Sequence, residues 1–125
     1  MTTPYQYQQK IAYFLNMSYL EYEQLRDAYF KAWCSTYDDA GYAPYKAMAN
    51  NDNLRNWFIE RWEIYVEKEL QRSYDDYLNK GVMTATDLQK TIFILSKEIL
   101  WLYPQVLIRE INRKSSKYGK RNVCK

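Results

Sequence analysis

Apolar side chains recur along this chain at intervals of three and four residues, the spacing of one face of an α-helix. The first such segment follows Thr3 and Pro4, residue types that favour a helix N-cap and a first helical position. A helix over residues 4–16 is therefore expected. Its inward side chains are Tyr7, Ile11, Phe14 and Leu15.

A second helix is expected over residues 19–38. Ser18 and Glu21 have the spacing of a capping box, in which a hydroxyl and a carboxylate each bond the other residue's backbone. Gly41 suits the position just after a helix end. The helical period predicts an inward stripe made of Tyr22, Leu25, Tyr29, Ala32, Trp33 and Thr36, flanked by Tyr19, Phe30 and Tyr37. The residues expected to close the core from this helix are Tyr22, Tyr29, Phe30 and Trp33.

Two further segments lead to a long helix. Residues 43–49 predict a short helix begun by Pro44, and Asp52 is the expected N-cap of a helix over 53–79 that stops before Gly81. Its expected inward face is Leu54, Phe58, Trp62, Tyr65, Val66 and Leu70. Its expected outward face is Glu60, Glu63, Glu67 and Gln71.

The most apolar part of the chain is residues 91–108. A helix over 87–103, capped by Thr84 or Thr86, is apolar on nearly every side, and this predicts a place at the centre of a bundle. Pro104 interrupts it, so a corner and a last helix over 105–117 are expected.

These elements define an all-α fold, a single-domain bundle of four or five helices. Three glycines and three prolines in 125 residues are too few for the turns of an all-β fold. Residues 1–108 form the expected helical body. Residues 109–125 form a basic segment that continues the last helix of the same domain.

Charge is distributed unevenly. Residues 108–125 hold seven of the 18 basic side chains and one of the 15 acidic ones, so the rest of the chain carries a net negative charge. On a helix, positions 109, 113, 117 and 120 fall on one side, and a basic ridge attracts phosphate backbones. Basic C-terminal segments also occur on ordinary proteins, where they increase solubility or complement a helix dipole without any ligand. Contact with nucleic acid or a nucleoprotein is the leading functional hypothesis. Its residues are Arg109, Arg113, Lys114, Lys117, Lys120 and Arg121. Leu107, Ile111 and Tyr118 are expected to hold this ridge to the body.

Two other kinds of partner fit the same sequence. An acidic protein complements a basic ridge as well as nucleic acid does. The 14 tyrosines have apolar rings and polar tips, which suit half-buried positions as well as protein interfaces. The favoured interpretation is that they line the boundary of the core. The alternative hypothesis is thus a protein–protein adaptor or a homo-oligomer. Its contact face is Tyr5, Tyr7, Tyr13 and Tyr19.

Enzyme chemistry is disfavoured. The chain has no histidine, which removes the commonest general base and most transition-metal sites, and it has no glycine-rich phosphate loop. We therefore expect no cofactor, metal or catalytic residue. Glu60, Glu63 and Glu67 share one helix side and could bind Mg²⁺ or act as acids and bases, but a solvated outer face is the favoured interpretation.

The cellular setting follows from absences in the sequence. The first residues, MTTPYQYQQK, do not resemble a signal peptide, so a cytoplasmic protein is expected. Ser96, Lys97 and Glu98 interrupt the apolar segment, which argues against membrane insertion. Cys34 is expected to pack inside a helix, and a disulfide to Cys124 is disfavoured.

Overall fold

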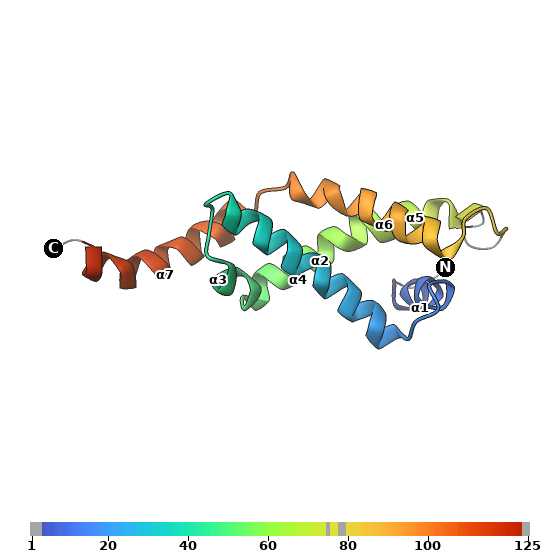
Figure 1. The fold of residues 1–125 in the computed structure, drawn as a ribbon, viewed down its shortest axis with the longest axis horizontal. Coiled ribbons are helices and arrows are strands. Elements are labelled where there is room, and N and C mark those ends of the chain that lie inside the picture. The colour runs from blue at the N-terminus through green and yellow to red at the C-terminus, as the bar shows by residue number, and fades with distance from the viewer. Residues whose placement is uncertain (1–3, 75, 78–79, 124–125) are drawn as a thin grey trace.

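The fold is all-α, as expected. The computed structural model describes residues 4–74, 76–77 and 80–123, with the side chains of Pro4 and of 115–123 excluded, and it contains no strand in this part of the chain. Its elements are α1 (Pro4–Phe14), α2 (Tyr19–Asp39), α3 (Tyr45–Ala49), α4 (Asp52–Trp62), η1 (Glu63–Glu67), α5 (Lys68–Arg72), α6 (Ala85–Leu100) and α7 (Gln105–Val123). Because α4, η1 and α5 follow one another without a break, they form one rod, which lies among the other helices (Figure 1).

The expected ends of α2 are confirmed. Ser18 Oγ accepts the Glu21 amide at 3.1 Å, and Glu21 Oε1 accepts the Ser18 amide at 2.9 Å. At the other end Gly41 has a φ of +84°, a conformation that costs glycine little. The Gly41 amide bonds the Asp38 carbonyl and the Tyr42 amide bonds the Tyr37 carbonyl, which satisfies two of the last carbonyls of α2.

Other helix ends differ from expectation by a few residues. The N-cap of α4 is Asn51, whose side chain accepts the Leu54 amide at 2.8 Å. Asp52 lies instead in the first turn, where a negative charge still favours the helix dipole. Helix α1 ends at Phe14, and Asn16 turns the chain with a φ of 61°. Thr3, the expected N-cap, lies outside the described residues.

The rod from α4 to α5 occupies the centre of the core. Its apolar side chains that are buried as expected are Leu54, Phe58, Trp62, Val66 and Leu70. Parts of the rod contact α1, α2, α3 and α6, which surround it. The unbroken rod ends at Arg72, and Ser73 interrupts it. Tyr74, Asp76 and Tyr77 are helical again, while Asn79, the expected end, lies outside the described part of the chain.

Helix α6 is a surface helix, and its expected central position is wrong. Its Thr84 cap is confirmed, because Thr84 Oγ1 accepts the Asp87 amide at 3.1 Å. One face, with Leu88, Ile92 and Ile99, is buried, whereas Phe93 is 50% and Ile94 63% exposed. Apolar composition did not distinguish a helix buried on all sides from one with an uncovered face, since exposed apolar residues are common.

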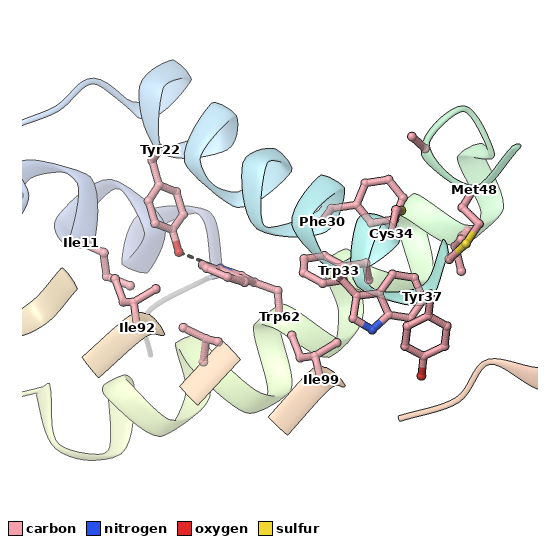
Figure 2. Packing of buried hydrophobic residues seen from close by; sticks show 14 of the residues in the cluster. Ile11, Tyr22, Phe30, Trp33, Cys34, Tyr37, Met48, Trp62, Ile92 and Ile99 are labelled. Carbon is pink, nitrogen blue, oxygen red and sulfur yellow. Dashed lines mark hydrogen bonds between the residues drawn. The ribbon is translucent and has the colours of Figure 1, made fainter. Parts of the chain in front are cut away.

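The inward face of α2 is rotated from the predicted stripe. Ala32 and Thr36 are exposed. The buried residues are Tyr22, Phe30, Trp33, Cys34 and Tyr37, and Figure 2 shows the last four near Met48 of α3. The physical reason is that α2 contacts both α3 and α4, which together cover the flank carrying Phe30, Cys34 and Tyr37. The period of the helix was predicted correctly, but its neighbours decide which flank is covered.

Residues 101–104 form the expected corner at Pro104, and α7 then leaves at an angle of 69° to α6. Figure 1 shows α7 extending beyond α2 and α3, away from the rest of the molecule. In the described residues no single helix is long and apolar enough to cross a membrane. Helix α6 and residues 105–114 meet those criteria only when taken together across this bend.

Candidate functional site

Three tyrosines hold the base of α7. The Tyr37 hydroxyl donates to the Leu102 carbonyl at 2.6 Å, which ties the corner to α2. The Tyr103 ring lies 5.7 Å from Tyr37 and 5.0 Å from Tyr42, measured between ring centroids. Burial raises the pKa of Tyr37 to about 12, so this hydroxyl stays a hydrogen-bond donor at neutral pH. The direction of α7 is therefore set by contacts from α2 and the loop after it.

Among the described side chains of α7, those in its first turns pack against the rest of the protein. Ile108 and Ile111 are buried, and the Asn112 amide donates to the Tyr42 carbonyl at 2.6 Å. Ile111 was expected in this role. Leu107, also expected, is only half-buried, and Ile108 takes the larger part. The side chain of Tyr118 lies outside the described part of the structure.

The basic residues expected at the ridge lie on this same helix. Arg109, Arg113 and Lys114 are exposed. Arg113 forms an ion pair with Glu110 one turn earlier, so part of its charge is balanced. The backbone stays helical through Val123, which gives positions 109, 113, 117 and 120 a common side by helical register. The side chains of Lys117, Lys120 and Arg121 are outside the described residues.

The four tyrosines of the alternative interface do not share one face. Tyr13 is 86% exposed, and Tyr5 is exposed with its ring 4.8 Å from that of Tyr19. Tyr7 is 2% exposed and belongs to the core. The reason is its helical spacing from Ile11, four residues later, which places both on the buried side of α1.

A buried carboxylate is the feature that sequence reasoning missed. Glu67 was expected to point to solvent with Glu60, yet its exposed fraction is 3%. The cause is η1, a turn of π-helix in which the Lys68 amide bonds the Glu63 carbonyl five residues back. A π turn is wider than an α turn, so the residues after it face a different direction from the one an α-helical wheel predicts.

Two donors from other helices hold the Glu67 carboxylate. The Tyr22 hydroxyl donates to Oε2 at 2.6 Å, and the Gln8 amide donates to Oε1 at 2.9 Å. Burial raises the pKa of Glu67, and these two bonds and the more distant charge of Arg26 offset only part of that rise. Among the described residues, no lysine or arginine forms an ion pair with Glu67.

The hydrogen-bond network extends one step further on each side. The Trp62 indole donates to the Tyr22 oxygen at 3.0 Å, as drawn in Figure 2, and the Tyr19 hydroxyl donates to Gln8 Oε1 at 2.8 Å. The nearby Tyr7 hydroxyl is buried without a hydrogen-bond partner in the described part of the chain. Burial, and then the charge of Glu67, raise the pKa of Tyr7 far above its ordinary range.

This network joins α1, α2 and η1 and acts as a structural link. A buried carboxyl with a raised pKa is a common sign of acid–base catalysis. Here each oxygen of Glu67 is occupied by a protein donor, and the side chain is almost fully enclosed. No group of three potential metal ligands occurs among the described residues, so Glu60, Glu63 and Glu67 do not form the Mg²⁺ cluster considered above. The one available signal in the sequence was Gln8, a polar residue beside Tyr7 on the apolar side of α1.

No family model, curated protein or solved structure matches this chain. The class of protein is therefore inferred from the geometry of α7 and from the chemistry of its side chains.

Proposed function

We propose that this chain is a small non-enzymatic binding protein that contacts nucleic acid through α7. The observation that carries the proposal is the course of α7. The helix is anchored at Ile108 and Ile111 and then extends from the body, with Arg109, Arg113 and Lys114 exposed on it. A helix in this position offers its cations to a partner without moving any other element.

The dimensions of α7 suit a nucleic-acid groove. Its 19 residues are about 28 Å long at about 1.5 Å per residue. The major groove of DNA is about 12 Å wide and admits an α-helix with its side chains. Lysine and arginine neutralise phosphates and release counterions, which supplies most non-specific affinity.

The net negative charge of the chain before residue 108 also favours contact through α7. The chain before residue 108 carries 11 basic and 14 acidic side chains, which repel a phosphate backbone on balance. Contact through α7 keeps this part away from the nucleic acid, whereas contact through the body does not. The nucleic acid is thus expected to meet α7 rather than the rod or α6.

The test compares two variants of equal net charge. In the ridge variant Arg109, Arg113, Lys117 and Lys120 are changed to Gln. In the control variant four exposed cations of the body are changed to Gln: Lys68, Arg72, Lys80 and Lys90. Binding of a fluorescein-labelled DNA duplex and of a labelled single strand is measured by anisotropy over a range of salt concentrations.

The ridge variant is expected to bind at least about tenfold more weakly than the control. Its plot of log affinity against log salt should be shallower by up to about 3.6, because each phosphate contact contributes about 0.9. Equal losses in both variants would show that net charge alone sets the binding and would refute the proposal. Equal affinity for poly-glutamate and for DNA would favour an acidic protein as the partner.

The second candidate is a protein adaptor or homo-oligomer that uses Tyr5, Tyr13 and Tyr19. The observation in its favour is the exposure of Tyr13 and Tyr5, whose rings offer apolar contact area at low entropic cost. Tyr7 has no part in it. Sedimentation velocity of the wild type and of Tyr13→Ser tests self-association. A concentration-independent monomer in both would remove the oligomer.

A further inference from the structure

We propose that the outer side of α6 docks on an anionic lipid surface, at the depth of the lipid headgroups. Four residues form this surface, the α6 stripe: Lys90, Ile94, Lys97 and Trp101. Docking of this kind needs no helix that crosses the membrane, because the helix lies along the surface with one side in the headgroup layer. The stripe includes no residue of α7, so the inference goes beyond the proposed contact with nucleic acid.

The spacing of the α6 stripe places its residues in one line. They are separated by four, three and four positions, which is the spacing of one side of an α-helix. Trp101 keeps this register because, as the C-cap of α6, it still has α-helical backbone angles. The buried residues Leu88, Ile92 and Ile99 fall on the opposite side, where α6 contacts the rod. Figure 1 accordingly shows α6 along one edge of the molecule.

The apolar members of the stripe are strongly exposed. Trp101 is 83% and Ile94 is 63% exposed, and Phe93, on one flank of the stripe, is 50% exposed. Exposed apolar residues scattered singly are ordinary in proteins. Here three of them lie within residues 93–101 of one surface helix, so they can enter the same apolar layer together.

Two lysines give the stripe its charge. Lys90 and Lys97 are exposed and alternate with the apolar members, and the one exposed acid beside them, Glu98, lies on a flank. The Lys97 ammonium lies 4.7 Å from the centroid of the Phe93 ring. A lysine stem packs along apolar groups while its ammonium reaches outward. The cations and the apolar side chains therefore meet the same surface of a partner.

This combination of charge and apolar contact favours a lipid surface over other partners. A phosphate backbone attracts lysines but gives Ile94 and Trp101 no apolar layer to enter. A second copy docked through the same stripe would bring its own lysines against these. A protein partner normally covers about 20–30 residues on each side, far more than four residues along about 17 Å of helix. An anionic bilayer offers negative headgroups with hydrocarbon directly beneath them, and Trp is enriched at that depth.

Binding is tested by co-sedimentation of the full chain with vesicles of phosphatidylserine and phosphatidylcholine in equal parts. We expect a weak affinity, with an apparent lipid dissociation constant of about 0.1–1 mM, close to that of a single acyl chain. Vesicles of phosphatidylcholine alone should bind more weakly, because they lack the charge that attracts the lysines.

Tryptophan emission reports whether the stripe is the part that binds. Trp33 and Trp62 are buried and Trp57 is half-buried, whereas Trp101 is exposed. Transfer of the Trp101 indole from water to the headgroup layer should shift the emission to the blue. Trp101→Phe should remove this shift and leave the vesicle affinity within about threefold of wild type, since it keeps an apolar ring.

Two matched pairs of variants separate apolar contact from charge. Ile94→Ser should weaken vesicle binding about fivefold, because it removes an apolar side chain from the contact. Its control is Leu20→Ser on α2, because Leu20 is 62% exposed, close to the 63% of Ile94, and this change should have no effect. Lys97→Gln should weaken binding to the anionic vesicles about fivefold. Lys68→Gln removes the same charge from an exposed position of α5 and should have a smaller effect.

Any of three results would overturn the inference. They are no vesicle binding up to about 1 mM lipid, vesicle binding without a blue shift, and equal losses in Ile94→Ser and Leu20→Ser. Self-association that Ile94→Ser abolishes, without vesicle binding, would assign the stripe to a second copy instead.

The two proposals can fail separately. The ridge variant should keep the blue shift at saturating lipid, because the α6 stripe is unchanged in it. Ile94→Ser should bind DNA with the affinity of wild type, because α7 is unchanged. Loss of DNA binding in the ridge variant alone, or of vesicle binding in Ile94→Ser alone, therefore reports on one surface only.

Discussion

Replacing Glu67 by Gln should remove one specific pH dependence from the stability of this protein. Gln has nearly the same shape as Glu and keeps one acceptor for Tyr22 or Gln8, but it carries no charge. Burial raises the pKa of Glu67 above its ordinary value of 4.5. The folded protein therefore holds a proton at this carboxyl over a pH range in which the unfolded chain has released it.

The sign of the effect follows from that proton. The stabilising contribution of the protonated Glu67 carboxyl is complete below pH 4.5 and is lost as the pH rises through the folded-state pKa. For a single group the wild type loses about 1.4 kcal/mol of unfolding free energy per pH unit in this window. With Glu67 only 3% exposed, screening by solvent is small. Glu67→Gln has no such slope, so its stability relative to wild type should rise with pH.

The assay is urea unfolding followed by tryptophan fluorescence from pH 4 to pH 8. The free energy of unfolding of wild type is subtracted from that of Glu67→Gln at each pH, which cancels the contribution of all shared titrating groups. The difference in unfolding free energy at the lowest pH reports the change in hydrogen bonding. The increase of this difference with pH reports the buried charge. A difference in unfolding free energy that is constant, or that decreases as pH rises, would refute the reasoning.

Glu67→Ala is the companion variant. It leaves the donors of Tyr22 and Gln8 without an acceptor, at a cost of about 1–3 kcal/mol each, and it opens a cavity as well. It should therefore be less stable than Glu67→Gln at every pH. If both variants were equally stable, the hydrogen bonds to Glu67 would contribute nothing.

Three further changes test other parts of the fold. Tyr22→Phe should cost about 1–3 kcal/mol in urea unfolding, because it removes the donor to Glu67 and the acceptor of a buried indole; a loss no larger than that of an exposed substitution would contradict the network. Asn51→Ala should cost about 1 kcal/mol and more than Asp52→Ala, since Asn51 is the N-cap; the reverse order in thermal melts would restore Asp52 as the cap. Burial raises the pKa of Cys34 to about 12, so iodoacetamide at pH 8 should modify it in urea but not in the native protein, as mass spectrometry of its peptide can show.

Local signals in the sequence located several helix ends. Ser18 with Glu21, Gly41 and Thr84 each satisfy backbone groups within a few residues, so their roles do not depend on the rest of the fold. Pro104 marks a corner for the same reason, since it lacks an amide hydrogen and restricts the residue before it. The choice of Asn51 over Asp52 was harder, because both residue types cap helices well.

The candidate sites were predicted less completely. The clustering of positive charge at the C-terminal end is visible in the sequence, and the helical register of its positions followed from the period. The buried state of Glu67 could not be predicted, because the heptad-like spacing of Glu60, Glu63 and Glu67 assumes an unbroken α-helix.

The sequence by itself determined the all-α class, the period of each helix and the concentration of positive charge after residue 108, because these depend on neighbouring residues along one chain. Tertiary structure decided which flank of α2 is covered, why α6 keeps an exposed face and how α7 leaves the body. The π turn that places the Glu67 side chain in the core is likewise visible only in the tertiary structure. A helix has many directions in which it can face a neighbour, and only the packing of all helices around the rod selects one.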